Sequence, residues 1–176
     1  MPTKLLIVRH AIAENKETFA LSGEGDELRP LTSRGRKKMR KNLIGIKGIC
    51  PHLDEIITSP LTRAVETAKI IRKEYPKAKV VAYDELKPGS KMAPLLEILR
   101  QYKKKEAIAV VGHEPHLSQL VSFLVMNRQR SCVTFKKGAV CLLEFRDKID
   151  KGCATLVYLL QPLALRKMVN AKDASH

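Results

Sequence analysis

Short apolar runs alternate along the chain with longer segments in which apolar residues recur every three or four positions. The short runs are rich in β-branched residues and predict strands, whereas the longer amphipathic segments predict helices. The predicted strands are Lys4–Arg9, Glu55–Thr58, Lys79–Val81, Ala107–Val111, Ala139–Phe145 and Ala154–Leu160. The predicted helices are Thr32–Ile46, Pro60–Tyr75, Met92–Tyr102 and Pro115–Met126.

The order of these segments indicates the fold class. One helix separates each of the first four strands from the next, which is typical of βαβ units in a parallel sheet. The last two strands are joined by RDKIDKGC, Arg146–Cys153, and this short connection predicts a hairpin with an antiparallel edge strand. We therefore expect an α/β fold of three layers, in which helices cover both faces of a mostly parallel central sheet. The length of 176 residues predicts one domain over residues 1–176.

Three other features refine this prediction. Ala13–Pro30 has no clear period, and we expect it to form a long functional loop above the strand ends. Ser59 is expected to cap the helix that follows it, with Pro60 at the first helical position. The chain after Pro162 is expected to be partly helical and to fray at Asn170–His176.

The charge of the chain is strongly positive. Its 33 Lys and Arg residues exceed its 18 Asp and Glu residues, giving a net charge of +15. Such an excess favours anionic partners, although it is also typical of a solubilising surface. The basic runs are either exposed faces or a docking surface for an acidic phosphoprotein. Without interleaved aromatic residues or a recognised motif, we expect no nucleic acid partner. These runs are Arg34–Lys41, Lys103–Lys105 and Lys136-Lys137.

The cysteines and the apolar runs bear on location. The four cysteines lack CxxC spacing, and three of them lie in or beside apolar runs. Reduced, buried thiols are therefore expected, which indicates a cytoplasmic protein. The first apolar run, Leu5–Val8, is too short for the core of a signal peptide, and no later run is long enough to cross a bilayer. We expect no membrane partner.

Candidate chemistry lies at the predicted strand ends. Ligands of open α/β sheets bind beyond the carboxyl ends of the strands. Arg9 and His10 end the first strand, Arg63 lies one turn into the helix after the second, and His113 follows the fourth. One guanidinium group can donate two parallel hydrogen bonds to two oxygens of a phosphate. An imidazole can attack phosphorus to form a phosphoenzyme. Each residue alone is compatible with a structural role, but together they favour phosphoryl transfer.

These residues are also compatible with two other uses. A metal site is one, but the histidines contain only one close pair, His113-x-x-His116, and two arginines at the site would repel a cation. We therefore expect no metal and no cofactor. A basic binding module that holds phosphate without turnover is the other, although a pure binder has no use for a nucleophile at His10.

Four stretches resemble motifs of the histidine phosphatase superfamily, which includes phosphoglycerate mutases and acid phosphatases. VRHAIAE resembles its Arg-His-Gly motif, TSPLTRAVETA its second-arginine motif, and VVGHEPHLSQL its second-histidine motif. The three follow in the expected order over about three-quarters of the chain. DELRPLTSRGRKKM and the short length are similar to the small SixA-type phosphohistidine phosphatases.

The resemblance implies a phosphoglycerate mutase-like fold and metal-independent hydrolysis through a phosphohistidine enzyme intermediate. By motif, His10 is the implied nucleophile, and Arg9, Arg63 and His113 form the implied phosphate pocket. The implied substrate is phosphohistidine on a protein. The alternative is a small-molecule phosphomonoester, handled by the same superfamily.

The chain departs from the superfamily pattern at Ala11, and the role of Glu85 is open. Ala11 stands where a glycine is usual, which raises the question of whether the backbone there needs a positive φ. Glu85, in YDELKPG, resembles the carboxylate that often donates a proton, but it is equally compatible with a loop carboxylate near the site. The substrate class decides how much such an acid matters. The conjugate acid of a leaving imidazole has a pKa of about 6.5, whereas an alkoxide needs a positioned donor.

Overall fold

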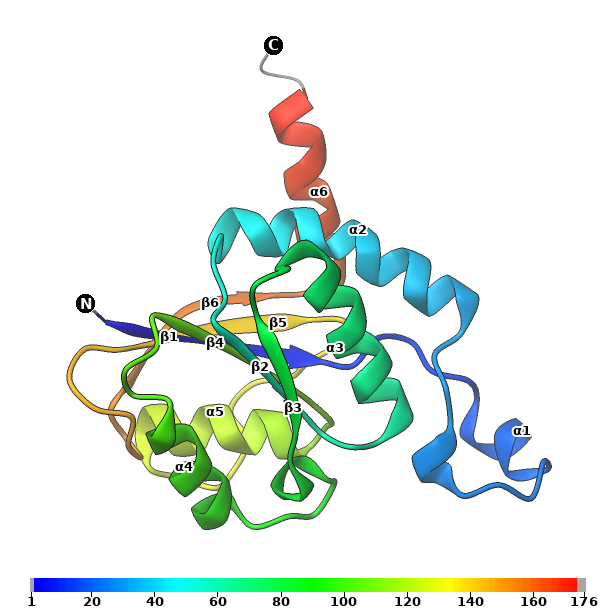
Figure 1. The fold of residues 1–176 in the computed structure, drawn as a ribbon, viewed down its shortest axis with the longest axis horizontal. Helices are drawn as coiled ribbons and strands as arrows, with labels where there is room; N and C mark the ends of the chain where they lie inside the picture. Colours follow the sequence, from blue (N-terminus) through cyan, green and yellow to red (C-terminus); the bar gives the residue numbers. More distant parts are fainter. Residues whose placement is uncertain (1, 174–176) are drawn as a thin grey trace.

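The protein is described by a computed structural model, which gives the backbone of residues 2–173 and the side chains up to residue 168. In this part of the chain, six strands form one sheet in the order β3-β2-β4-β1-β5-β6 (Figure 1). The four strands β3, β2, β4 and β1 pair in parallel, which confirms the predicted α/β class. The strands are β1 (Thr3–Arg9), β2 (Glu55–Thr58), β3 (Lys79–Ala82), β4 (Ala107–Gly112), β5 (Val140–Phe145) and β6 (Ala154–Leu160).

The hairpin prediction is confirmed, because β5 and β6 pair antiparallel and β6 forms one edge of the sheet. However, β5 also pairs antiparallel with β1 on its other side. The strand that runs against the rest is therefore β5, one position in from the edge, and β6 runs in the direction of β1.

Helices cover both faces of the sheet (Figure 1). Helices α4 and α5 pack on one face, and α2 and α3 pack on the other, where α6 adds Leu165. These three layers match the expected architecture. The helices are α1 (Lys16–Ala20), α2 (Ser33–Ile49), α3 (Thr62–Glu74), α4 (Met92–Gln101), α5 (His116–Met126) and α6 (Pro162–Asp173), with short 3-10 helices at Asp26–Leu28 and Asp84–Leu86.

Strand β1 shows how the sequence fills both layers. Leu5 and Ile7 pack with α4 and α5, whereas Leu6 and Val8 pack with α2 and α3, and all four are fully buried. An uninterrupted apolar run is typical of a parallel strand that is covered on both sides. The polar residues that follow this run therefore lie at the mouth of the sheet rather than within it.

The start of α2 holds the segment that follows the first strand. The Thr32 hydroxyl accepts a hydrogen bond from Gly35 N (2.9 Å), and the backbone N of Thr32 donates to Ile12 O (3.0 Å). A Cβ atom at Gly35 would lie 2.0 Å from Ile12 O, so this contact requires glycine. The close approach fixes the chain directly after His10.

The predicted cap of α3 is wrong. The helix begins at Thr62, with Leu61 in the N-cap position and no side-chain cap. The Ser59 hydroxyl accepts from Leu61 N (3.4 Å) and pairs with His113 Nε2 (2.8 Å). Ser59 therefore bridges the ends of two strands instead of capping a helix.

Residues 13–30 form an excursion from the sheet that is more ordered than predicted. Its ends meet in a β-bridge between Ala13 and Leu31, and it contains α1 and the 3-10 helix Asp26–Leu28. Figure 1 shows it projecting beyond the start of α2. Asn15 caps α1 by accepting from Thr18 N (3.0 Å). These elements are too short to produce a readable period.

The C-terminal helix and the cysteines complete the comparison with the predicted features. Helix α6 extends the partly helical tail to residue 173, and the fraying expected at residues 170–176 falls largely outside the described residues. All four cysteines are free, but only Cys50 and Cys141 are buried; Cys132 and Cys153 are exposed. Burial raises the pKa of Cys50 to about 11 and that of Cys141 to about 12. In the described part of the chain, no helix combines the length and apolarity that a bilayer crossing needs.

Candidate active site

A pocket of about 390 Å³ opens at the carboxyl ends of β1, β2 and β4. Four of the five predicted site residues, Arg9, His10, Arg63 and His113, line it, whereas Glu85 does not. Most of its other lining residues are charged as well. The further lining residues are Glu14, Asn15, Lys16, Arg29, Pro88, Glu114 and Lys137.

His10 is buried with one ring nitrogen engaged. Its Nδ1 lies 2.7 Å from Ala11 O, and because a carbonyl oxygen only accepts, Nδ1 carries the hydrogen. The lone pair is then on Nε2. Burial lowers the pKa of His10 to about 3, against an opposing contribution from the Ala11 hydrogen bond. At neutral pH this imidazole is neutral, with one nitrogen available to act as a nucleophile.

Ala11 answers the question raised by its position. Asn127 is the one non-glycine residue with a positive φ among residues 2–173, so Ala11 needs no glycine-like backbone. Its N–H donates to Thr67 Oγ1 (3.1 Å), and the Thr67 hydroxyl donates to Arg63 O (2.7 Å). Thr67 therefore ties the end of β1 to the first turns of α3.

His113 faces His10 across the pocket, with 5.1 Å between the ring centroids. Because Ser59 Oγ accepts from Leu61 N, its own hydrogen is free to bond with His113 Nε2. In that arrangement Nδ1 carries the hydrogen, and it is buried without a hydrogen-bond partner among the described residues. Burial, followed by the charge of Arg63, lowers the pKa of His113 to about 3. The Nδ1–H group of His113 is therefore a donor without an acceptor among the described residues.

The two predicted arginines are also incompletely paired. Arg9 donates from Nη1 to Phe135 O (2.5 Å), and Arg63 binds the backbone and carboxylate oxygens of Asp26 (2.8 and 3.1 Å). The Nε atom of each guanidinium is buried and has no partner among the described residues. Burial lowers the pKa of both groups. Unpaired buried donors are costly, and an anion in the pocket would satisfy them.

Three further cations at the pocket were missed by the sequence analysis: Lys16, Arg29 and Lys137. Arg29, nine-tenths buried, donates to Asp26 Oδ1 (2.7 Å) and to Glu14 O (2.6 Å). It belongs to the Arg-Pro-Leu-Thr stretch, which was a usable signal. Lys137 lies at the exposed rim, and its pKa is lowered by partial desolvation and by the charges of the three pocket arginines. It was assigned to a basic surface run, because nothing local links it to residue 9.

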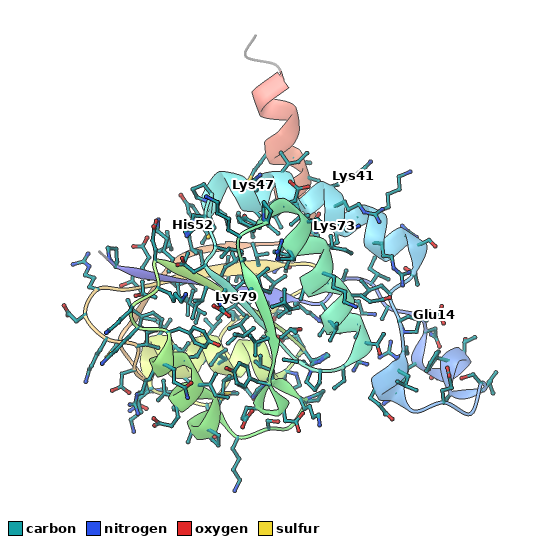
Figure 2. The ribbon with its side chains drawn as sticks, in the orientation of Figure 1. Glu14, Lys41, Lys47, His52, Lys73 and Lys79 are labelled. Carbon is teal, nitrogen blue, oxygen red and sulfur yellow. The ribbon has the colours of Figure 1, made fainter. Side chains whose placement is uncertain are left out.

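The carboxylates at the pocket differ from the predicted one. Glu85 is half-buried in the 3-10 helix Asp84–Leu86, and no hydrogen bond or ion pair within residues 2–173 fixes its carboxylate. Pro88, three residues later, reaches the pocket instead. Glu14 and Glu114 line it, and Glu114 accepts a hydrogen bond from Ser118 N (3.1 Å). Glu14 lies between β1 and α1 (Figure 2).

The electrostatics of the pocket favour a compact, multiply charged anion. Five cationic side chains line it against two carboxylates, with Asp26 behind them, and both histidines are neutral. A phosphoryl group matches this surplus of donors in charge and geometry. Within residues 2–173, no group of three or more His, Cys, Asp or Glu side chains is arranged to hold a metal ion.

Comparison with known proteins agrees with this chemistry. Residues 5–88 match the sequence model of the histidine phosphatase superfamily (branch 1), and this stretch contains Arg9, His10 and Arg63. The matched stretch is 84 of the 176 residues, slightly under half of the chain. His113 lies beyond the matched stretch, and the structure brings it to the same pocket.

Solved structures extend the likeness to most of the chain. The protein histidine phosphatase SixA, complexed with tungstate, superposes with a TM-score of 0.76 at 23% identity, covering 93% of this chain and 99% of that chain. A phosphoserine phosphatase from Entamoeba histolytica, in complex with phosphoserine, gives a TM-score of 0.64 at 18% identity, covering 89% and 96%. At these identities the likeness establishes the fold alone.

A sequence relative is more similar over a shorter stretch. The serine/threonine-protein phosphatase Pgam5, mitochondrial, from Drosophila ananassae is 36% identical over 88 residues. The aligned stretch is 49% of this chain and 30% of that protein. The shared part is therefore a minor portion of that relative.

Proposed function

We propose that this protein is a phosphohistidine phosphatase that acts on a histidine-phosphorylated protein, without a metal, through a phosphoryl intermediate on His10. The observation that carries the proposal is the free Nε2 of a neutral, buried His10 inside a pocket lined by five cations. A neutral imidazole among unpaired donors suits attack on a bound phosphoryl group. The cytoplasmic location that we also propose rests on the free thiols.

The reaction proceeds in two displacements. Arg9, Arg63 and the Nδ1–H of His113 hold the phosphoryl oxygens. The lone pair on His10 Nε2 forms a bond to phosphorus while the bond from phosphorus to the substrate imidazole breaks. The substrate ring, already protonated on its other nitrogen, keeps the electron pair of the broken bond and leaves as a neutral imidazole. Water then attacks phosphorus, the His10–phosphorus bond breaks, and phosphate leaves while a proton passes to solvent.

Three observations favour phosphohistidine over other phosphoryl donors. An imidazole leaving group has a conjugate acid with a pKa of about 6.5, so its departure needs little help from the enzyme. The carboxylate expected to give such help, Glu85, does not line the pocket. The likeness to SixA covers 99% of that chain, and SixA is named as a protein histidine phosphatase.

A phosphomonoesterase is the second candidate, and a specific feature favours it. Glu14 and Glu114 line the pocket, so a carboxylate is present that could protonate an alkoxide. The likeness to a phosphoserine phosphatase points in the same direction. The two candidates differ in the leaving group, so substrate choice separates them.

The deciding experiment compares substrate classes under one condition. Purified protein is assayed in excess chelator against a phosphohistidine peptide and a panel of phosphate monoesters. We expect a higher kcat/KM on the peptide, with His10→Ala as the inactive control. A preference for a monoester would establish the second candidate instead, and dependence on added metal would contradict the proposed mechanism.

The proton donor is tested with two matched variants, Glu85→Gln and Glu114→Gln. Neither is expected to cost much on phosphohistidine, since the leaving imidazole carries its own proton. On a monoester, loss of the true donor lowers kcat/KM by roughly 10²–10⁴-fold. The variant that changes the ratio between the two substrates identifies the donor, and a large loss on phosphohistidine itself would favour the monoesterase.

A further inference from the structure

We call the pocket that is lined by Arg9, His10, Arg63 and His113 the phosphate pocket. A second pocket, of about 530 Å³, adjoins it. It lies between α2, the turn before β5 and the start of α6. Arg9 and Lys137 line both pockets, so the two meet at these side chains. A molecule whose phosphoryl group rests on Arg9 can therefore extend across Lys137 into the second pocket.

The two pockets have complementary chemistry. In the phosphate pocket the one apolar lining residue is Pro88, so its walls bind charge and offer no surface for a side chain of the substrate. The second pocket has an apolar floor that includes the buried Met39, and the exposed Leu163 lies at its rim. The cations around it are Arg9, Lys38, Lys136, Lys137 and Arg166, and its lining contains no carboxylate.

The wall of the second pocket is built into the catalytic end of the sheet. Asn42, almost fully buried, donates to Gly138 O (3.1 Å) and accepts from Arg166 Nη1 (3.0 Å). Gly138 N in turn lies within hydrogen-bond distance of Arg9 O and His10 O (3.1 and 3.2 Å). Gly138 has a φ of +83°, which suits glycine. This chain of bonds connects α2, α6 and the nucleophile strand.

The rim of the second pocket is open to a partner. Leu163, at the start of α6, is 59% exposed although it is a large apolar side chain. Lys136 is exposed and Lys38 is half-buried, and neither is in an ion pair among the described residues. An apolar contact surrounded by unpaired cations is complementary to an apolar residue flanked by acidic ones.

We propose that the second pocket binds the polypeptide segment beside the phosphohistidine, and that this segment combines acidic side chains with an apolar one. The inference rests on the proposed function, since it assumes that a protein carries the phosphoryl group. It assigns the recognition of that protein to residues outside the phosphate pocket. The charge surplus around the pocket selects the acidic flank, and the floor selects the apolar residue.

The test uses two phosphohistidine peptides that are identical except for the flank, which carries Glu and Leu in one and Lys and Gln in the other. The double variant Lys38→Glu/Leu163→Glu reverses one charge and removes the exposed apolar contact. We expect wild type to prefer the acidic peptide, and the variant to lose about 10-fold or more in kcat/KM on that peptide, mainly through KM. Free phosphohistidine, which reaches only the phosphate pocket, reports whether the variant is folded.

A matched control comes from the outer side of α2. Lys41→Glu/Ile44→Glu makes the same chemical changes at exposed positions outside both pockets, and Figure 2 shows Lys41 projecting away from the body. This control is expected to keep the preference for the acidic peptide. An equal loss in the control and in the test variant would overturn the proposal, as would an equal kcat/KM for the two peptides in wild type.

A binding measurement separates this inference from the proposed function. Fluorescence anisotropy of the unphosphorylated acidic peptide reports the second pocket without any turnover. Binding to wild type and to the control, with loss in the test variant, supports the pocket even if phosphohistidine is not hydrolysed. Absence of binding to wild type overturns the pocket, whereas hydrolysis of free phosphohistidine independently supports the proposed function.

Discussion

The two ends of the central sheet each carry a histidine beside charged groups, but they satisfy these groups in opposite ways. At the amino ends of β2 and β4, the Asp54 carboxylate accepts from Glu106 N (2.8 Å), Ala107 N (3.1 Å) and His52 Nε2 (3.0 Å). Burial tends to raise the pKa of Asp54, but these hydrogen bonds hold it below its usual value. The Asp54 carboxylate is thus fully hydrogen-bonded by groups of the protein itself.

At the carboxyl ends the groups lack partners. Three buried donor atoms have no hydrogen bonds among the described residues: Arg9 Nε, Arg63 Nε and His113 Nδ1. Partial desolvation and the charges of the three pocket arginines lower the pKa of Lys137 beside them. The difference teaches that the Asp54 cluster belongs to the stability of the fold, whereas the pocket cluster keeps donors that a ligand would satisfy. A histidine beside a carboxylate is therefore not by itself the sign of a catalytic site in this protein.

The largest expected effect separates the two histidines. His10→Ala removes the nucleophile, so turnover of phosphohistidine falls to the background rate while inorganic phosphate still binds through the arginines. Rapid quenching of wild type, followed by peptide mapping, locates the acid-labile phosphoryl group on His10. His52→Ala, at the other end of the sheet, is the control and keeps full activity. Turnover by His10→Ala near the wild-type rate contradicts the mechanism.

Arg63→Ala is expected to have the next largest effect. It removes charge stabilisation of the transferring phosphoryl group, and the loss of one such donor lowers kcat by roughly 10²–10³-fold. The loss appears on every substrate, because every substrate presents the same phosphoryl group. Arg100→Ala is the matched control, since Arg100 pairs with Glu97 and Asp150 away from the pocket. A loss confined to one substrate would assign Arg63 to substrate recognition instead.

The Asp54 end of the sheet is expected to show the reverse pattern. Asp54→Ala leaves two backbone N–H groups without their acceptor, which lowers the free energy of unfolding by about 1–3 kcal/mol. The kcat/KM is unchanged at temperatures where the variant is folded. Urea unfolding measures the stability, and Asp54→Asn, which keeps an acceptor, recovers part of it. A fall in kcat/KM without a loss of stability would contradict the assignment of Asp54 to the stability of the fold.

The last prediction concerns pH. Burial lowers the pKa of His10 and His113 to about 3, below the value of about 6.5 in an unfolded chain. Between these values the unfolded chain binds more protons than the folded one, so the free energy of unfolding falls as pH drops from about 6.5 towards 3. Urea unfolding at several pH values measures the slope, and His10→Ala is expected to reduce it. NMR titration of either ring near pH 6.5 would contradict the neutral pocket.

Regular elements were predictable where burial alone determines the pattern. The predicted bounds of β2 and β6 agree with the structure, because apolar runs end sharply at polar or turn residues. The sequence indicated four of the pocket residues because each lies at the end of a predicted strand or shortly after it: Arg9, His10, Arg63 and His113. The α/β topology then dictates that these ends meet on one side of the sheet.

The missed features depend on contacts between distant segments. Lys137 reaches the pocket because β5 pairs with β1, an arrangement that no local pattern around residue 137 indicates. Ser59 does not cap α3 because the helix begins only at Thr62, with Leu61 in the N-cap position. Residues 16–28 are held by hydrogen bonds to Asn15 and Arg29 rather than by an apolar face. This segment therefore has no periodic apolar pattern from which its helices could be predicted.

The place of β1 in the sheet sets the order in which the protein is assembled. Its neighbours are β4 and β5, so Leu6 pairs with Ala109 on one side and with Leu142 on the other. Residues 5–88 contain the proposed nucleophile, His10, and the three pocket arginines, but neither of the strands that pair with β1. During translation this strand waits without partners until β4, at residues 107–112, has left the ribosome. Such long-range pairing slows folding, and an incomplete chain exposes a ready edge for aggregation while it lacks any working site.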